Sequence, residues 1–141
     1  MEQMTEFATN HYLLFSALGV ILVLLAQNLI GGAFRSYELA SPQQLAALVN
    51  HEDATVLDVR ENKEYVDGHI LNSIHIPLSE LTRRLTELDK FKESPVVICC
   101  RSGHRSAQAC GQLKKSGFEK IHNLEGGTLA WQDAGLPLNK T

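Results

Sequence analysis

Apolar residues are arranged in two different ways along the chain. Residues 12–34, YLLFSALGVILVLLAQNLIGGAF, carry no charge and place Leu, Val and Ile on every face of a helix. At 1.5 Å per residue, such a helix is long enough to cross roughly 30 Å of hydrocarbon. After residue 40 the apolar residues come in short runs between polar segments, which is typical of alternating strands and helices.

We interpret residues 12–34 as an uncleaved transmembrane helix after an N-terminal tail at 1–11. A cleavable signal peptide would need a basic region before the apolar run, but Glu2 and Glu6 precede it and the first basic residue is Arg35. A buried core helix is the alternative, but it is disfavoured because Leu, Val and Ile cover every face and leave no polar stripe for solvent. All 13 Lys and Arg residues follow the span, which favours a single-pass inner-membrane protein with a cytoplasmic C-terminal domain.

The rest of the chain divides into a short polar linker at 35–40, a domain at 41–138 and a C-terminal tail at 139–141. The domain is expected to begin with a helix. Ser41 is a suitable N-cap, a proline follows at the first turn, and Gln44 completes a capping box.

The remaining runs predict the fold class. Short apolar runs predict strands at 55–59, 73–77, 95–100 and 121–124, and helical spacing predicts helices at 79–90, with Ser79 as N-cap, at 104–116 and at 128–133. The run at 95–100 shows no polar alternation, so it should be covered on both faces and lie centrally. This alternation of strands and helices predicts an α/β fold with a central parallel sheet and helices on both faces.

Composition and charge narrow the functional classes. Among the 141 residues, 44% are hydrophobic and 21% charged, as in folded proteins, and the net charge of −3 gives no reason to expect a nucleic-acid partner. Three cysteines, of which Cys99 and Cys100 are adjacent, do not suggest a disulfide framework, and reduced thiols fit a cytosolic setting. The scattered histidines show no ligand spacing, so we expect neither a metal nor a cofactor.

Chemistry is expected where the central strand ends. Cys100 is its last residue, and Arg101, Ser102, Gly103 and His104 lead from it into the next helix. In an open α/β sheet, ligands bind at the carboxyl ends of the strands. Backbone N–H groups of such a loop, together with the helix dipole, favour a thiolate over a thiol. Cys100 is therefore a candidate nucleophile, whereas Cys99 and Cys110 are expected to be core residues.

The stretch CRSGHRS, in which four residues separate Cys100 from Arg105, resembles the active-site loop of the rhodanese family of sulfurtransferases. Two flanking stretches agree with this resemblance, so that three ordered signatures extend over about residues 38–138. The flanking signatures are Asp58-Val59-Arg60 with Glu64-Tyr65, Gly68-His69-Ile70 and Ser73-Ile74-His75-Ile76-Pro77, and Glu125-Gly126-Gly127 with Trp131. The resemblance implies an α/β fold with a central parallel sheet and a cysteine that carries a persulfide.

The resemblance also implies roles for individual residues. Cys100 would take a sulfane sulfur from a small donor such as thiosulfate and pass it to a thiol or cyanide, and the loop from Arg101 to Arg105 would bind the anionic donor. Alternatively, Arg101 and Arg105 only neutralise a solvated rim. Asp58 and Arg60 are expected to brace the loop and to pair with Glu64, and a catalytic role is their alternative. From the residues themselves, we expect His69 to close a turn against neighbouring backbone and Trp131 to be a core residue that anchors the last helix.

Two other functions remain open. Phosphatases of the same fold also use a cysteine and an arginine, but a tetrahedral phosphate needs a loop with one more residue, so the spacing from Cys100 to Arg105 favours sulfur. The stronger alternative is a membrane-tethered rhodanese module that mainly binds a partner protein. A membrane anchor at 12–34 motivates this alternative, because soluble thiosulfate does not require one, whereas a membrane-protein partner would.

Overall fold

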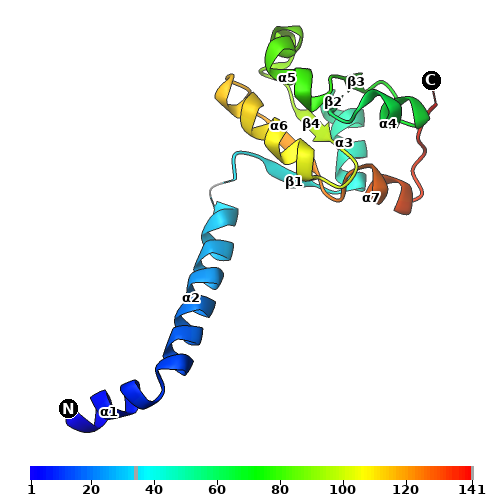
Figure 1. Ribbon diagram of the computed structural model, residues 1–141. Helices are drawn as coiled ribbons and strands as arrows, with labels where there is room; N and C mark the ends of the chain where they lie inside the picture. Colours follow the sequence, from blue (N-terminus) through cyan, green and yellow to red (C-terminus); the bar gives the residue numbers. More distant parts are fainter. Residues whose placement is uncertain (34, 141) are drawn as a thin grey trace. The chain divides into compact units, whose positions relative to one another are not determined.

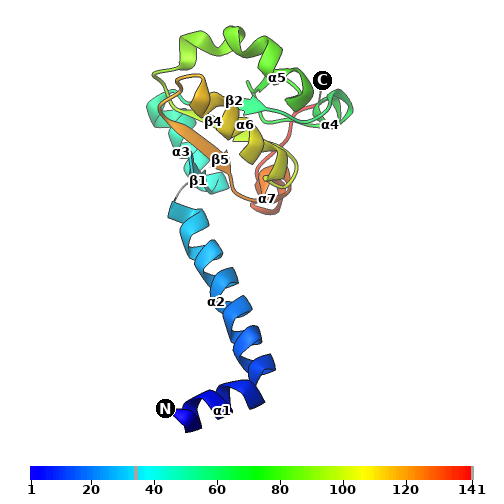
Figure 2. The same cartoon turned by 60° about the vertical axis from the view of Figure 1, so that its left-hand side comes forward.

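The computed structural model describes residues 1–33 and 35–140, without the side chains of residues 31–33. The chain forms two compact units, one from Met1 to Arg35 and one that starts at Ser36 (Figures 1 and 2). Each unit is described by itself.

The N-terminal unit consists of helices α1 (Glu2–Asn10) and α2 (Tyr12–Ala33). The segment expected as a tail is therefore largely helical, and its helix ends at Asn10, because the next residue, His11, has a φ of −122° that departs from helical values. Within α2, Tyr12–Ile30 has a mean hydropathy of 2.3 and no buried residue, so it is apolar and long enough to cross a membrane. Phe34, the last residue of the predicted span, lies outside the described residues.

The second unit contains a parallel sheet with the order β1-β5-β4-β2-β3 among the described residues. Its strands are β1 (Glu38–Ala40), β2 (Thr55–Asp58), β3 (Ile74–His75), β4 (Val96–Cys99) and β5 (Ile121–Leu124). The predicted central position of the strand before Cys100 is confirmed, since β4 lies between β5 and β2. Strand β1 lies in the segment expected to be a linker, where two of its three residues are exposed and gave no strand pattern.

Helices cover both faces of the sheet, as predicted. They are α3 (Pro42–Glu52), α4 (Asn62–Asp67), α5 (Leu78–Arg84), the 3₁₀ helix η1 (Leu85–Phe91), α6 (His104–Lys115) and α7 (Gly127–Asp133). One core cluster joins α5, η1 and α6 to the sheet through residues such as Leu81, Leu88 and Leu113. The other joins α3 and α7 to the opposite face through Leu45 and Trp131. Trp131 thus anchors the last helix, as expected.

Of the two predicted helix N-caps, the structure confirms one and contradicts the other. At α3, Ser41 Oγ accepts from Gln44 N at 3.2 Å, and Ser41 N donates to Gln44 Oε1 at 2.8 Å, which confirms the capping box. The cap assigned to Ser79 is wrong, because α5 already starts at Leu78 after the extended residue Pro77. The expected single helix at 79–90 is also divided into α5 and η1.

Helix α4 was not predicted. It has only six residues, none of them buried, so it lacks the apolar stripe that marks a longer helix. A second capping box, formed by Glu61 and Glu64, holds its first turn.

Candidate active site

Cys100 directly follows β4, at the carboxyl end of the central strand. Cys99 and Cys100 point to opposite faces, as their adjacency predicts, because Cys99 packs in the α3 and α7 core cluster and Cys100 in the α5 and α6 cluster. All three cysteines are free thiols. Only Cys100 adjoins the loop that leads into α6, so this loop carries the candidate nucleophile.

Hydrogen bonds converge on the Cys100 sulfur. Gly103 N donates to Sγ at 3.1 Å, and Ser106 Oγ lies 3.3 Å from Sγ. Gly103 has a φ of +102°, a conformation that favours glycine and that turns its N–H back toward the sulfur. Burial would raise the pKa of Cys100, but hydrogen bonds from the Ser106 side chain and from the Ser106, Ser102 and Gly103 amides outweigh it and lower the pKa.

The start of α7 holds the same loop from the other side. Thr128 N donates to Cys100 O at 2.8 Å, and Leu129 N donates to Arg101 O at 3.2 Å. These carbonyls therefore face α7, which leaves the loop amides free to turn toward the sulfur. Gly127 has a φ of +62°, and a Cβ there would lie 2.4 Å from the Cys100 and Arg101 carbonyls. The Gly-Gly pair of the C-terminal signature thus permits close contact between two backbones.

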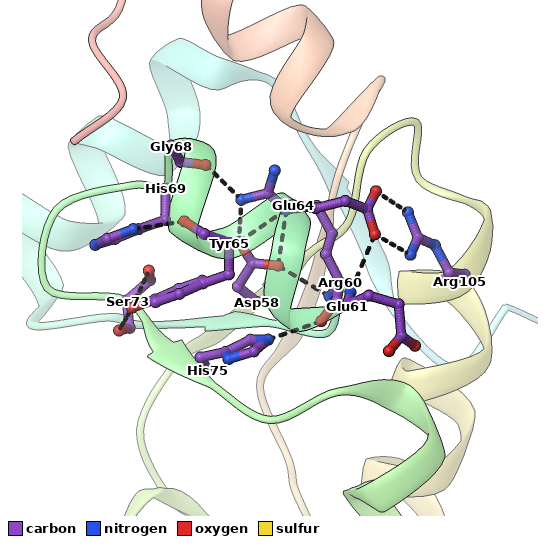
Figure 3. Close-up of polar contacts among 10 residues, drawn as sticks. All are labelled: Asp58, Arg60, Glu61, Glu64, Tyr65, Gly68, His69, Ser73, His75 and Arg105. Carbon is purple, nitrogen blue, oxygen red and sulfur yellow. Dashed lines mark hydrogen bonds and ion pairs between the residues drawn. The ribbon is translucent and has the colours of Figure 1, made fainter. Parts of the chain in front are cut away.

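Arg105 makes a bidentate ion pair with Glu64 of α4. Both N···O distances are 2.7 Å, and Glu64 Oε2 also accepts from Glu61 N at 3.0 Å (Figure 3). The hydrogen bond from Arg105 lowers the pKa of Glu64 to about 2, although partial burial acts against it. The expectation that Glu64 pairs with Asp58 and Arg60 is therefore wrong: its carboxylate bonds to the guanidinium of Arg105, and Arg60 acts on it only through its charge.

Asp58 and Arg60 pair with each other. Asp58 Oδ2 lies 2.7 Å from Arg60 Nη2, which also donates to Gly68 O at 2.7 Å (Figure 3). Burial would lower the pKa of Arg60, but its hydrogen bond and charge interaction with Asp58 raise it. Asp58 is 0% and Arg60 5% exposed, so the pair connects the end of β2 to the end of α4 as a buried brace.

An aromatic stack holds α4 against β3. The ring of Tyr65 lies between those of His69 and His75, with centroid distances of 3.9 and 4.2 Å. His69 Nδ1 lies 2.9 Å from Tyr65 O, which confirms its turn-closing role, and His75 Nε2 donates to Arg60 O at 2.7 Å (Figure 3). The stack therefore fixes the backbone that carries both Arg60 and Glu64.

A cavity of about 250 Å³ borders the loop, and Arg60, Glu64, Arg101 and Gln132 are among its lining residues. Arg101 is exposed, and its side chain has no hydrogen-bond or ion-pair partner in the described part of the chain. Ser102 and His104 are also exposed. The two loop arginines therefore differ: Arg101 is available to an anion, whereas the Arg105 fork is occupied by Glu64.

The other two thiols are held in the protonated form. Burial raises the pKa of Cys99, and it raises the pKa of Cys110 to about 12. Among the described residues no group of three His, Cys, Asp or Glu side chains is placed to hold a metal ion. The arrangement thus concentrates its nucleophilic chemistry on a single sulfur.

Two residues near the sulfur were not predicted. Ser106 Oγ donates to Asn123 Oδ1 at 2.6 Å, and Asn123 Nδ2 donates to Gly103 O at 3.1 Å. Both side chains are buried, at 0% and 4% exposure. A signal was present in the sequence. Asn123 lies two residues after Ile121 on a strand, so both side chains are on the same face, and an Asn at a core-facing position needs a buried partner.

The profile of the rhodanese-like domain matches residues 41–134 of the chain. The chain belongs to the rhodanese-like domain family. A sulfurtransferase of Allochromatium vinosum is 37% identical over 101 residues, which cover 72% of this chain and 92% of that protein. The uncharacterized protein YibN of Escherichia coli is 29% identical over 139 residues, which cover 98% of this chain and 97% of that protein.

Further relatives show the same family and fold. The uncharacterized protein slr1261 of Synechocystis is 40% identical over 101 residues, which cover 72% of this chain but only 55% of that protein. The crystal structure of a rhodanese-related protein from Thermoplasma volcanium has a TM-score of 0.66 and 35% identity, and the match covers 73% of this chain and 98% of that one. The rhodanese fold of the second unit is thereby shown.

Proposed function

We propose that the protein is a membrane-anchored sulfurtransferase that carries sulfur as a persulfide on Cys100. The observation that supports this most directly is the hydrogen bond from Gly103 N to Cys100 Sγ, in a loop whose amides lower the pKa of that thiol. A thiolate is the nucleophile that attacks sulfur. The sulfurtransferase name of the Allochromatium vinosum relative supports the same class of reaction.

In the first half-reaction the Cys100 thiolate attacks the outer sulfur of a donor such as thiosulfate. A bond forms between Sγ and that sulfur, the bond to the sulfonate group breaks, and sulfite leaves with the electron pair. The terminal sulfur of the persulfide keeps one negative charge, which the amides of Ser102 and Gly103 are placed to stabilise. Arg101, exposed and unpaired among the described residues, attracts the anionic donor to the loop.

In the second half-reaction a thiol acceptor or cyanide attacks the terminal sulfur and restores the Cys100 thiolate. Sulfur is transferred without an external oxidant or reductant, and the cycle is ping-pong. Residues 12–33 would anchor the domain to the membrane, close to a donor or acceptor protein of that membrane. The apolar helix α2 supports this anchor.

The test is the mass of the intact full-length protein in detergent after incubation with thiosulfate. We expect the gain of one sulfur atom, its loss on addition of a thiol, and no gain in Cys100→Ser. Cys110→Ser is the matched control and should load like the wild type, because burial keeps Cys110 protonated. An unchanged mass with thiosulfate, alkyl persulfide and protein persulfide donors would overturn the proposal and favour the partner-binding module.

The phosphatase alternative is tested with the same preparation and an aryl phosphate. Four residues separate Cys100 from Arg105, and the Arg105 guanidinium that a phosphate would need is bonded to Glu64 at 2.7 Å. We therefore expect no hydrolysis above that of Cys100→Ser.

A further inference from the structure

Polar side chains form a buried chain of hydrogen bonds behind the Cys100 sulfur. Ser106 Oγ lies 3.3 Å from Sγ and 2.6 Å from Asn123 Oδ1, and Asn123 Nδ2 lies 3.1 Å from Gly103 O. Cys100, Ser106 and Asn123 are 1%, 0% and 4% exposed. These hydrogen bonds connect the reactive sulfur to β5, on the far side of the loop.

The direction of each hydrogen bond follows from donor and acceptor chemistry. The carbonyl of Gly103 can only accept, so the amide nitrogen of Asn123 must face it and the amide oxygen must face Ser106. That oxygen also only accepts, so Ser106 must donate its hydroxyl proton to it. A hydroxyl has one proton, so while Ser106 donates to Asn123 it cannot donate to Sγ as well. It can favour the Cys100 thiolate only when the proton turns from Asn123 to the charged sulfur.

The charge on Sγ changes during the sulfurtransferase cycle. In the persulfide the negative charge lies on the terminal sulfur, so Sγ needs no strong donor and the Ser106 proton can stay with Asn123. When an acceptor thiolate attacks the terminal sulfur, a new S–S bond forms and the bond to Sγ breaks, leaving its electron pair and the negative charge on Sγ. Rotation about the Cβ–Oγ bond of Ser106 then turns the proton from Asn123 to Sγ.

We propose that Ser106 is the hydrogen-bond donor that stabilises Cys100 Sγ as the leaving group when the persulfide is discharged, and that Asn123 is a positioning residue that holds the hydroxyl proton until then. This inference rests on the proposed function. A thiol with a lower pKa is a better leaving group but a weaker nucleophile, so Ser106 should speed discharge and leave loading nearly unchanged.

Other groups around the sulfur are the same in all variants. Arg101, His104 and Arg105 lie on the loop, and Cys99 and Cys110 lie in the core on either side of the sheet. Differences between variants at one pH therefore report on the Ser106 hydroxyl.

The first experiment separates the two half-reactions in single turnovers of the full chain in detergent at pH 9. Protein is loaded with thiosulfate, freed of excess donor and mixed with a small thiol. In Ser106→Ala we expect discharge to slow about tenfold, as for loss of a hydrogen bond to a charged group, and loading to change less than about twofold. Equal discharge rates in Ser106→Ala and wild type would overturn the proposal.

The second experiment needs no sulfur donor and measures the pH dependence of Cys100 alkylation by iodoacetamide, located by peptide mass. Ser106→Ala should raise the pKa of Cys100 by about one unit, because the thiolate loses a donor. Asn123→Ala should lower it, because the competing acceptor is removed. In the double variant, Asn123→Ala should not lower the pKa of Cys100 any further, since the Ser106 hydroxyl proton that it would release is absent.

Comparison of the two single variants with the double variant distinguishes the proposal from a purely structural role. An Asn123→Ala shift of equal size in the presence and absence of the Ser106 hydroxyl would mean that Asn123 acts through Gly103, and would overturn it. If Ser106→Ala does not fold, Asn123→Ala alone decides, and an unchanged or raised pKa overturns the proposal. If wild-type Cys100 accepts no sulfur, the proposed function fails. The alkylation measurements on the single and double variants still test whether the Ser106 hydroxyl donates to the Cys100 thiolate.

Discussion

Burial and hydrogen bonding act in opposite directions on Cys100. A buried thiol resists ionisation when hydrogen bonds do not compensate for its burial, as Cys99 and Cys110 show by their raised pKa values. Cys100 is also buried, but backbone amides and the Ser106 hydroxyl beside the sulfur favour its thiolate, and its pKa is lowered. The difference between these thiols therefore comes from the loop after β4, whose backbone is held in place by Gly103 and by the start of α7.

Gly127→Ala should disrupt this loop. A Cβ at Gly127 would lie 2.4 Å from the Cys100 and Arg101 carbonyls, so those carbonyls must move and the amides that face the sulfur move with them. We expect a raised pKa of Cys100 in alkylation assays and a loss of persulfide loading.

Gly135→Ala is the matched control, because Gly135 has a similar φ of +77° but nothing within 4 Å of its Cβ position. It should cost about 1 kcal/mol of stability through left-handed strain and leave the pKa of Cys100 unchanged. The same pKa change in both variants would show that backbone strain, and not contact with the loop, is responsible.

The sequence predicts the loop but not its distant partners. A cysteine where a buried strand ends, followed by a glycine and a helix start, is enough to locate Cys100 and Gly103. The partner of Arg105 is Glu64, 41 residues away, and the partner of Ser106 is Asn123, 17 residues away. Which carboxylate or amide meets which donor depends on how α4 and β5 pack beside α6, and no local pattern carries that information.

At the scale of elements, α4 and α6 are joined by the ion pair between Glu64 and Arg105. The Glu64 pKa of about 2, below its ordinary value of 4.5, means that the folded state favours the carboxylate. The resulting stabilisation is fully present above pH 4.5 and is lost as the pH falls toward 2. Acid should therefore weaken the connection between the active-site loop and the aromatic stack of α4.

Glu64→Gln tests this linkage. At pH 7 we expect the free energy of unfolding in urea to fall by about 1 kcal/mol, a modest value because the pair is about a third exposed and water screens it. The difference from wild type should shrink between pH 4.5 and pH 3. Glu119→Gln, at an exposed carboxylate, is the control and should change little at either pH. A difference that does not depend on pH would contradict an ionic origin.

Helix starts show where local patterns suffice and where they do not. The capping box at Ser41 needs only residues three apart, and the structure confirms it. Ser79 has the same residue type before an apolar stripe, but Pro77 has a fixed φ and already directs the chain into α5. Strand β1 and helix α4 are too short to show a period, so their formation depends on tertiary contacts.

Ser41→Ala and Ser79→Ala form a matched pair of variants. Ser41→Ala removes the acceptor for Gln44 N and should cost about 1 kcal/mol of stability. Ser79→Ala removes no side-chain cap hydrogen bond and should stay within about 0.5 kcal/mol of wild type. Urea unfolding measures both, and an equal loss in the two variants would contradict the assigned start of α5.

At the scale of the whole molecule, an apolar helix and a rhodanese-like domain are combined in one chain. Tyr12–Ala33 has 22 residues, which gives about 33 Å of helix and matches the hydrocarbon core of a bilayer. YibN matches 98% of this chain, so its similarity extends over the apolar segment as well as the domain. Cytoplasmic placement would keep the three thiols reduced, as the proposed reaction requires.

Membrane anchoring predicts how the full chain fractionates in a bacterial host. We expect it to stay in the membrane pellet after alkaline carbonate, with an intact N-terminus by mass, because α2 is apolar on all faces. Leu22→Arg with Leu25→Arg should shift the protein to the soluble fraction, since each arginine costs roughly 2.5–3.5 kcal/mol at the centre of a span. Leu71→Arg, at an exposed apolar residue of the domain, is the control and should remain in the pellet.

Orientation is measured on the same preparation with a C-terminal fluorescent protein that matures only in the cytoplasm. All 13 Lys and Arg residues follow the span, so we expect fluorescence, and protease added outside spheroplasts should leave the domain intact. If the mass of the isolated protein shows that the host has cleaved off the N-terminal segment, that segment is a signal sequence. In that case the domain would face an oxidising compartment, where a Cys100 persulfide needs a different source of reduced acceptor.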